Sequence, residues 1–155
     1  ELEKIESKFK EGDVVVDGDG CICLVSKIKN SFWAIVSTIL YKKDHIIIYN
    51  NPDITRVISN CTLASIADRN KLFSALVREG YKYDKEQHKL IKQKFKPFEK
   101  VLVRDDTNEK WSINIFSYYD EEKEDFPYIC LSGCYLYCIP YEGNEYLLGT
   151  TDSPM

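Results

Sequence analysis

The sequence lacks any long uninterrupted apolar run. No run approaches the roughly 18 to 20 residues that a helix needs to cross a bilayer, which excludes a membrane-spanning helix. The basic and apolar pattern of a secretory leader is missing as well, so we expect a cytoplasmic location. Hydrophobic residues make up 44% of the 155 positions and charged residues 30%, which predicts a soluble globular protein with a modest core.

Groups that carry catalysis are also scarce. Only two histidines, His45 and His88, could act as base for a cysteine nucleophile, and neither stands in a recognisable motif. The carboxylates gather in turns, where they solvate the chain, and no Gly-rich phosphate cradle occurs. These absences predict that the protein is not an enzyme and needs no cofactor.

Two patterns suggest metal binding, and both are incomplete. Cys130, Cys134 and Cys138 are spaced by three residues and Cys21 and Cys23 form a close pair, but a zinc site needs four ligands, usually paired across tight turns. We therefore predict buried structural thiols and no metal, with metal or disulfide use as the alternative.

The second pattern is Asp17–Gly20, which resembles the opening of a calcium loop. Its twelfth position is Ile28 where such a loop needs a bidentate Glu. An Asp-Gly hairpin turn explains these residues better.

Charge is distributed unevenly along the chain, whose net charge is -4. Residues 1–93 carry 15 Lys and Arg against 13 Asp and Glu, a net of +2, whereas residues 94–155 carry 6 against 12, a net of -6. The C-terminal part is therefore predicted to be a poor binder of polyanions.

An internal repeat with a period of about 86 residues organises the sequence. Lys8–Lys10 returns as Lys94–Lys96, and each copy continues into a short apolar stretch and an acidic turn. The far ends, Thr62–Ser65 and Leu147–Thr150, also correspond. Two related modules, at residues 8–65 and 94–152, are the economical explanation.

Each module shows short alternating stretches separated by turn residues, which is typical of antiparallel strands. In the first module we predict strands at residues 13–16, 21–28, 32–38, 45–49 and 55–59, with a turn at 50–53. In the second module we predict strands at residues 100–104, 110–118, 126–131 and 135–140. The predicted fold class is mainly β, with two tandem SH3-like barrels.

A helix is predicted at residues 66–79, between the modules. Ser65 and Asp68 match a capping-box-like start, and Gly80 matches a left-handed stop. Strands at 81–84 and 89–92 would form a hairpin after the helix, so residues 66–93 connect the modules.

Two segments carry a resemblance that spans nearly the whole chain. Leu72–Asp84, LFSALVREGYKYD, and Cys138–Thr151, CIPYEGNEYLLGTT, resemble uncharacterised proteins of gut Bacteroidales, their phages and mobile elements. Tyr83 stands where this family leads us to expect Trp, which keeps an aromatic anchor. The resemblance implies no reaction, cofactor or catalytic residue.

Aromatic residues cluster in the second module, where seven of the eleven tyrosines fall between Tyr118 and Tyr146. Strict alternation would place Tyr135, Tyr137 and Ile139 on one face. Such a face could grip an extended peptide, as SH3-like barrels do, or it could simply tile a two-sided sheet. The candidate binding residues are Trp111, Tyr118, Tyr119, Tyr135 and Tyr137.

The sequence therefore favours a non-enzymatic interaction module, such as an accessory protein of a phage or mobile element, that recognises a protein segment. The alternative is a nucleic-acid-binding accessory protein that uses the mildly basic first module. Its candidate residues are Lys27, Lys29, Lys42, Lys43 and Arg56. Acidic residues at 120–125 would repel phosphate from the aromatic cluster.

Overall fold

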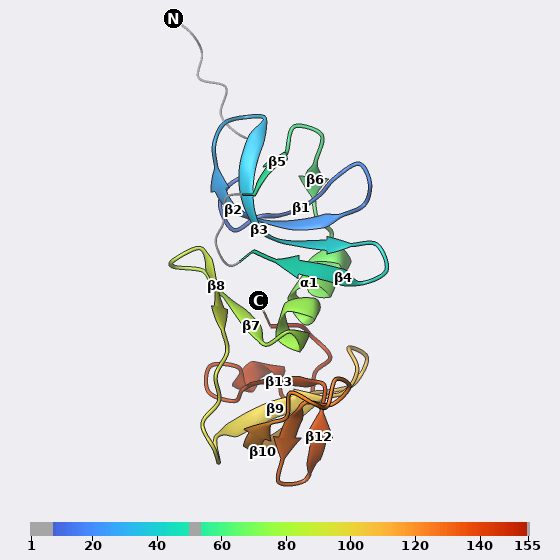
Figure 1. Cartoon of the computed structure of the whole chain (residues 1–155), viewed down its shortest axis with the longest axis vertical. Coiled ribbons are helices and arrows are strands. Elements are labelled where there is room, and N and C mark those ends of the chain that lie inside the picture. Colours follow the sequence, from blue (N-terminus) through green and yellow to red (C-terminus); the bar gives the residue numbers. More distant parts are fainter. Residues whose placement is uncertain (1–7, 50–53, 155) are drawn as a thin grey trace, which may run out of the picture. The chain divides into compact units, whose positions relative to one another are not determined.

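The computed structural model describes residues 8–49 and 54–154, which form a β-rich fold with one α-helix and several antiparallel sheets (Figure 1). The chain divides into two compact units. Unit 1 comprises the chain up to Ala75 together with Tyr83–Ile91, and unit 2 comprises Leu76–Lys82 and the chain from Lys92 onward. Within the described ranges, no helix is long and apolar enough to span a membrane.

Unit 1 contains one antiparallel sheet. Its strands are β1 (Val14–Val16), β2 (Ile22–Ile28), β3 (Trp33–Tyr41), β4 (His45–Ile48), β5 (Thr55–Val57) and β6 (Thr62–Leu63). The order is β4-β3-β2-β1-β6, and β5 also pairs with β3. One core cluster holds the sheet together, with Val15, Val25 and Ile39 almost fully buried in it.

The sheet of unit 2 repeats this order. Its strands are β9 (Lys100–Arg104), β10 (Ser112–Tyr119), β11 (Tyr128–Cys130), β12 (Gly133–Tyr135) and β13 (Tyr137–Pro140), and a 3-10 turn η1 (Glu145–Leu147) follows. The order is β12-β11-β10-β9-β13, so in both units four sequential strands form a meander and the last strand pairs with the first. No pairing among the described residues closes either sheet.

Strand β9 is buried on both faces. Val101 and Val103 pack into one core cluster and Leu102 into another, as the alternation of a strand requires. The first cluster includes Phe116 and Tyr128, and the second includes Trp111. Unit 2 is therefore organised around two cores.

A tight turn precedes the first strand of unit 1. The amide of Asp13 donates to the carbonyl of Lys10 (3.1 Å), and the amide of Gly12 donates to Val25 on β2 (2.8 Å). Gly12 has a φ of 87°, the left-handed conformation that a type II turn requires at this position.

The same turn recurs 86 positions later in unit 2. The amide of Glu99 donates to Lys96 (3.0 Å), and the amide of Phe98 donates to Phe116 on β10 (2.7 Å). Phe98, which takes the place of Gly12, has a φ of 66°. The sequence repeat thus coincides with the same hydrogen bonds at the same point of each sheet.

Helix α1 (Ile66–Arg78) and the hairpin of β7 (Tyr81–Asp84) and β8 (Lys89–Lys92) confirm the predicted helix and hairpin. The hydroxyl of Ser65 accepts from the amide of Asp68 (3.1 Å), which caps the first turn. Gly80 follows the helix with a φ of 81°.

Most predicted strands are confirmed, with bounds that differ by three residues at most. One further strand is present, and two predictions differ from the structure or lie outside the described residues. Strand β6 was not predicted, the strand predicted at 135–140 is divided into β12 and β13, and the turn predicted at 50–53 lies outside the described residues.

Candidate functional site

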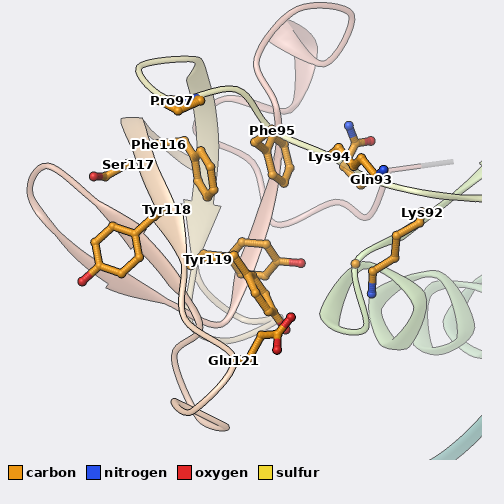
Figure 2. Close-up of a pocket in the computed structure, with 12 residues that line it drawn as sticks. Lys92, Gln93, Lys94, Phe95, Pro97, Phe116, Ser117, Tyr118, Tyr119 and Glu121 are labelled. Carbon is orange, nitrogen blue, oxygen red and sulfur yellow. The ribbon is translucent and has the colours of Figure 1, made fainter.

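Unit 2 contains a cavity of about 650 Å³ that is lined by aromatic residues, which we call the aromatic groove (Figure 2). One wall is an extended segment before β9, the other is the second half of β10, and Gly80 and Tyr128 complete the lining. The wall residues are Lys92, Gln93, Lys94, Phe95 and Pro97 on one side and Phe116, Ser117, Tyr118, Tyr119 and Glu121 on the other.

Four rings of the groove lie in continuous contact. Phe116 and Phe95 have ring centroids 5.2 Å apart, and Phe95 meets Tyr128 edge-on at 6.0 Å. Tyr128 in turn meets Tyr119 edge-on at 5.2 Å. Phe116 and Tyr128 are only 4% and 3% exposed and pack in a core cluster, so they fix the position of the more exposed rings of Phe95 and Tyr119.

The groove exists because β10 changes partners along its length. Strand β9 pairs with β10 only over Ser112–Ile115, whereas β11 pairs with it from Phe116 to Tyr119. The register shifts between Phe116 and Tyr118, which indicates a bulge at Ser117. Beyond this bulge, the edge of β10 that faced β9 has no strand partner among the described residues.

Charged groups stand around the groove. The ammonium of Lys92 donates to the carbonyl of Glu79 at the helix end (2.8 Å) and lies 4.7 Å from the ring centroid of Tyr81. Lys94 is exposed on the same wall, and Glu121 lies on the other. The groove therefore has a basic and an acidic side.

Two of the three tyrosines that line the groove, Tyr119 and Tyr128, have a raised pKa and stay protonated at neutral pH. Burial, followed by the carboxylates of Glu79 and Glu121, raises the pKa of Tyr119. Burial also raises the pKa of Tyr128, whose hydroxyl donates to the carbonyl of Val77 (3.5 Å). Near neutral pH the groove thus offers aromatic faces and neutral hydroxyl groups.

The structure brings only part of the predicted aromatic set together. Tyr118 and Tyr119 line the groove, and their side chains are 54% and 48% exposed. Trp111 and Tyr137 are buried in a core cluster of unit 2, and Tyr135 is half-buried against the other cluster. The last three are not part of the groove.

The predicted shared face of Tyr135, Tyr137 and Ile139 is wrong for Tyr135. Side chains alternate between the two faces only within one continuous strand. Here strand β12 ends at Tyr135 and β13 begins at Tyr137, and the amide of the intervening Leu136 donates to the Asp105 carboxylate (3.1 Å). Tyr137 and Ile139 pack in one cluster, whereas the hydroxyl of Tyr135 accepts a hydrogen bond from the Asn114 side chain (3.1 Å) near the other.

Trp111 holds the C-terminal segment in place. Its indole donates to the carbonyl of Asp152 (2.8 Å), and the Arg104 guanidinium, 4.1 Å from the Trp111 ring centroid, donates to Thr151 (2.9 Å). Arg104 is only 2% exposed, and burial lowers the pKa of its guanidinium. In this structure Trp111 has a structural role.

Sequence reasoning missed Phe95, Pro97, Phe116 and Tyr128. The one available signal was the segment Lys94–Lys96, in which an aromatic residue alternates with exposed lysines. This segment identified the repeat, but nothing local indicated that Phe95 would meet rings from two other strands.

The five basic residues of the alternative nucleic-acid face do not form one patch. Lys27 and Lys29 flank the end of β2 that pairs with the start of β3, whereas Lys42 and Lys43 follow the far end of β3. Arg56 pairs with the Asp17 carboxylate at 3.5 Å, so its charge is partly neutralised.

The cysteines lie mostly in the cores. All six are free thiols, five are buried, and Cys134 is half-buried. Burial is the main reason that the pKa of Cys23 rises to about 12. In the part of the chain that the structure describes, no three His, Cys, Asp or Glu side chains are arranged to hold a metal ion.

The segment Asp17–Gly20 forms a turn. One carboxylate oxygen of Asp17 accepts from the amides of Asp19 (2.9 Å) and Cys21 (3.0 Å).

No family model, curated protein or solved structure matches the chain. The function is therefore inferred from the groove and its surroundings.

Proposed function

We propose that the protein is a non-enzymatic interaction module and that its aromatic groove binds a segment of another protein. The observation that carries the proposal is the row of four touching rings beside an open strand edge. A volume of about 650 Å³ falls in the range of ligand-binding clefts. Rigid aromatic surfaces of this kind bind apolar side chains at low entropic cost.

The architecture supports a finer proposal about the fold. Both sheets have the same strand order and the same turn before the first strand. We propose that the modules at residues 8–65 and 94–152 are duplicated SH3-like barrels joined by residues 66–93. In this proposal the second copy carries the binding site.

A protein segment fits the groove better than nucleic acid does. Single strands bind to aromatic rings interleaved with cations, but residues 94–155 have a net charge of -6 and Glu121 lies in the groove. A peptide backbone can in addition pair with the open edge of β10. An accessory protein of a phage or mobile element, acting in the cytoplasm, would suit this role.

The test is selection of a random peptide library on the full chain, followed by affinity measurement on selected peptides. Tyr119→Ala should weaken binding by about tenfold or more, because it removes one of the touching rings. Tyr146→Ala is the matched control, since Tyr146 is exposed and lies outside the groove. Equal binding by both variants would contradict the proposal.

The nucleic-acid alternative is tested on the same protein with a single-stranded oligonucleotide. Phosphate contacts would give an affinity that falls steeply with salt and that is lost in a Lys42→Glu, Lys43→Glu variant. We expect no such binding. If the oligonucleotide binds in a salt-dependent way and the library yields no binding peptide, the protein is instead a nucleic-acid binder that uses unit 1.

A further inference from the structure

We infer that the groove binds its protein segment as an added β-strand, along the open edge of β10, and that it prefers a segment in which apolar and acidic residues alternate. This inference rests on the proposed function and specifies the ligand of the same site. It has three supports: the open backbone edge, the position of the rings, and the charge of the facing wall.

The first support is the backbone edge of β10. Ser117, Tyr118 and Tyr119 are consecutive and all line the groove, although neighbouring side chains of a strand point to opposite faces. Consecutive residues can share one groove when the strand borders it with its edge. The amide of Phe116 still donates to the carbonyl of Glu99 (2.9 Å), and its carbonyl accepts from the amide of Phe98 (2.7 Å). Over Ser117–Tyr119 the edge pairs with no strand in the described part of the chain, so this short stretch can receive another chain.

The second support is the alternation that an added strand would have. Every second side chain would point toward the half-buried ring of Phe95, which lies beside the buried ring of Phe116 (Figure 2). The remaining side chains would point to solvent. The rings therefore select apolar residues at alternate positions and leave the others free to be polar.

The third support is the charge of the facing wall. Lys92 and Lys94 line this wall, and Lys96 follows in the same segment without lining the groove. All three lysines are exposed and alternate with the half-buried Gln93 and Phe95. Lys92 is engaged by the Glu79 carbonyl, whereas Lys94 and Lys96 form no ion pair within residues 8–49 and 54–154. Carboxylates of an added strand that lie on the side of Lys94 would complement its ammonium group, whereas carboxylates on the side of Glu121 would be repelled, so the preference is for acidic side chains along one side only.

The strand-addition test uses a peptide selected on the full chain and two N-methylated versions of it. Methyl groups are placed on alternate amides in one version and on the intervening amides in the other. Only one set of amides faces β10 in an added strand, so one version should lose about tenfold or more in affinity and the other should bind nearly as before. Equal effects of the two versions would overturn strand addition.

The charge preference is tested by reversing the wall. The double variant Lys94→Glu, Lys96→Glu should bind an acidic selected peptide about tenfold more weakly. It should instead prefer a version of that peptide in which every Asp and Glu is replaced by Lys. Lys110→Glu, at an exposed site outside the groove, is the matched control. An unchanged order of the two peptides would overturn the acidic preference.

These outcomes separate the two proposals. Loss of binding in Tyr119→Ala with equal effects of both methylated peptides would leave the groove as the binding site and remove the strand mode. Unchanged binding in Tyr119→Ala would remove the groove itself.

Discussion

Units 1 and 2 share a strand order and a turn, yet they differ beside the second strand of each sheet. In unit 1, Phe9 and Val25 are 5% and 0% exposed and belong to the core. At the corresponding place in unit 2, Phe116 is equally buried, at 4% exposed, but Phe95 is only half-buried, and both residues line the groove. The same hydrogen-bonded frame thus encloses a filled core in one unit and borders an open groove in the other.

The turn before the first strand shows a second difference. In unit 1, a Cβ atom added to Gly12 would lie 3.1 Å from the hydroxyl oxygen of Tyr83. This site therefore needs glycine because space is short and because its φ is positive. In unit 2, Phe98 has a left-handed conformation and its side chain is 73% exposed. A repeated frame therefore tolerates very different side chains where the surface is free.

The largest expected effect concerns the buried cation of unit 2. Arg104→Ala would leave three carbonyl groups without their donor and a space beside Trp111, and should cost about 3 kcal/mol of unfolding free energy. Urea unfolding followed by tryptophan fluorescence measures this loss. Arg78→Ala, at an exposed helix position, is the control, and equal stability of the two variants would contradict the structural role of Arg104.

A matched pair of core truncations tests the division into units. Val15 and Val101 lie 86 positions apart in the first strand of each sheet, and both are buried. Val15→Ala and Val101→Ala should each cost about 2 kcal/mol. Amide hydrogen exchange should rise mainly in the unit that carries the substitution, and an equal rise in both units would show that they open together.

Substitutions at the two equivalent turn positions, Phe98 and Gly12, should change the free energy of unfolding in opposite directions. Phe98→Gly removes the strain of a bulky left-handed residue and should stabilise the protein by about 1 kcal/mol. Gly12→Ala introduces such strain and a close contact, and should destabilise it by about 1 to 2 kcal/mol. Thermal unfolding of both variants measures the difference, and a less stable Phe98→Gly protein would contradict this account of the turn.

The smallest expected effect is a pH dependence in unit 1. The folded state raises the pKa of Cys23 from its ordinary value of 9.0 to about 12, chiefly by burial. The folded protein therefore keeps a proton that the unfolded chain releases, so this contribution is present below pH 9 and is lost as the pH rises to about 12. Cys23→Val should show a shallower alkaline fall in the urea midpoint than the unchanged protein, and identical slopes would argue against it.

The sequence predicts the local elements well because their signals are local. Helix α1 is marked by Ser65 at its start and Gly80 beyond its end, and the observed helix ends one residue before the predicted limit. Strand β9 is an apolar run bounded by charged residues, and its bounds are as predicted. The SH3-like form of the two modules stays a prediction.

The groove could be predicted only in part. Tyr118 and Tyr119 belong to a visible tyrosine cluster, but Phe95 reaches Tyr128 only because the fold joins segments distant in sequence. The break at Leu136 likewise depends on Asp105, 31 positions away. The alternation of residues along one strand contains no information about contacts with distant residues. The face on which Tyr135 lies could therefore not be predicted from alternation.

The central claim is that the binding site belongs to unit 2, whereas the corresponding place in the described part of unit 1 is occupied by the buried Phe9 and Val25. Its most direct test is an amide NMR titration of the full chain with a selected peptide. The account predicts the largest shift changes at residues 92–97 and 116–119 and at Tyr128, with little change at the exposed Trp33 of unit 1. Changes centred on Trp33 and its neighbours in unit 1 would contradict it.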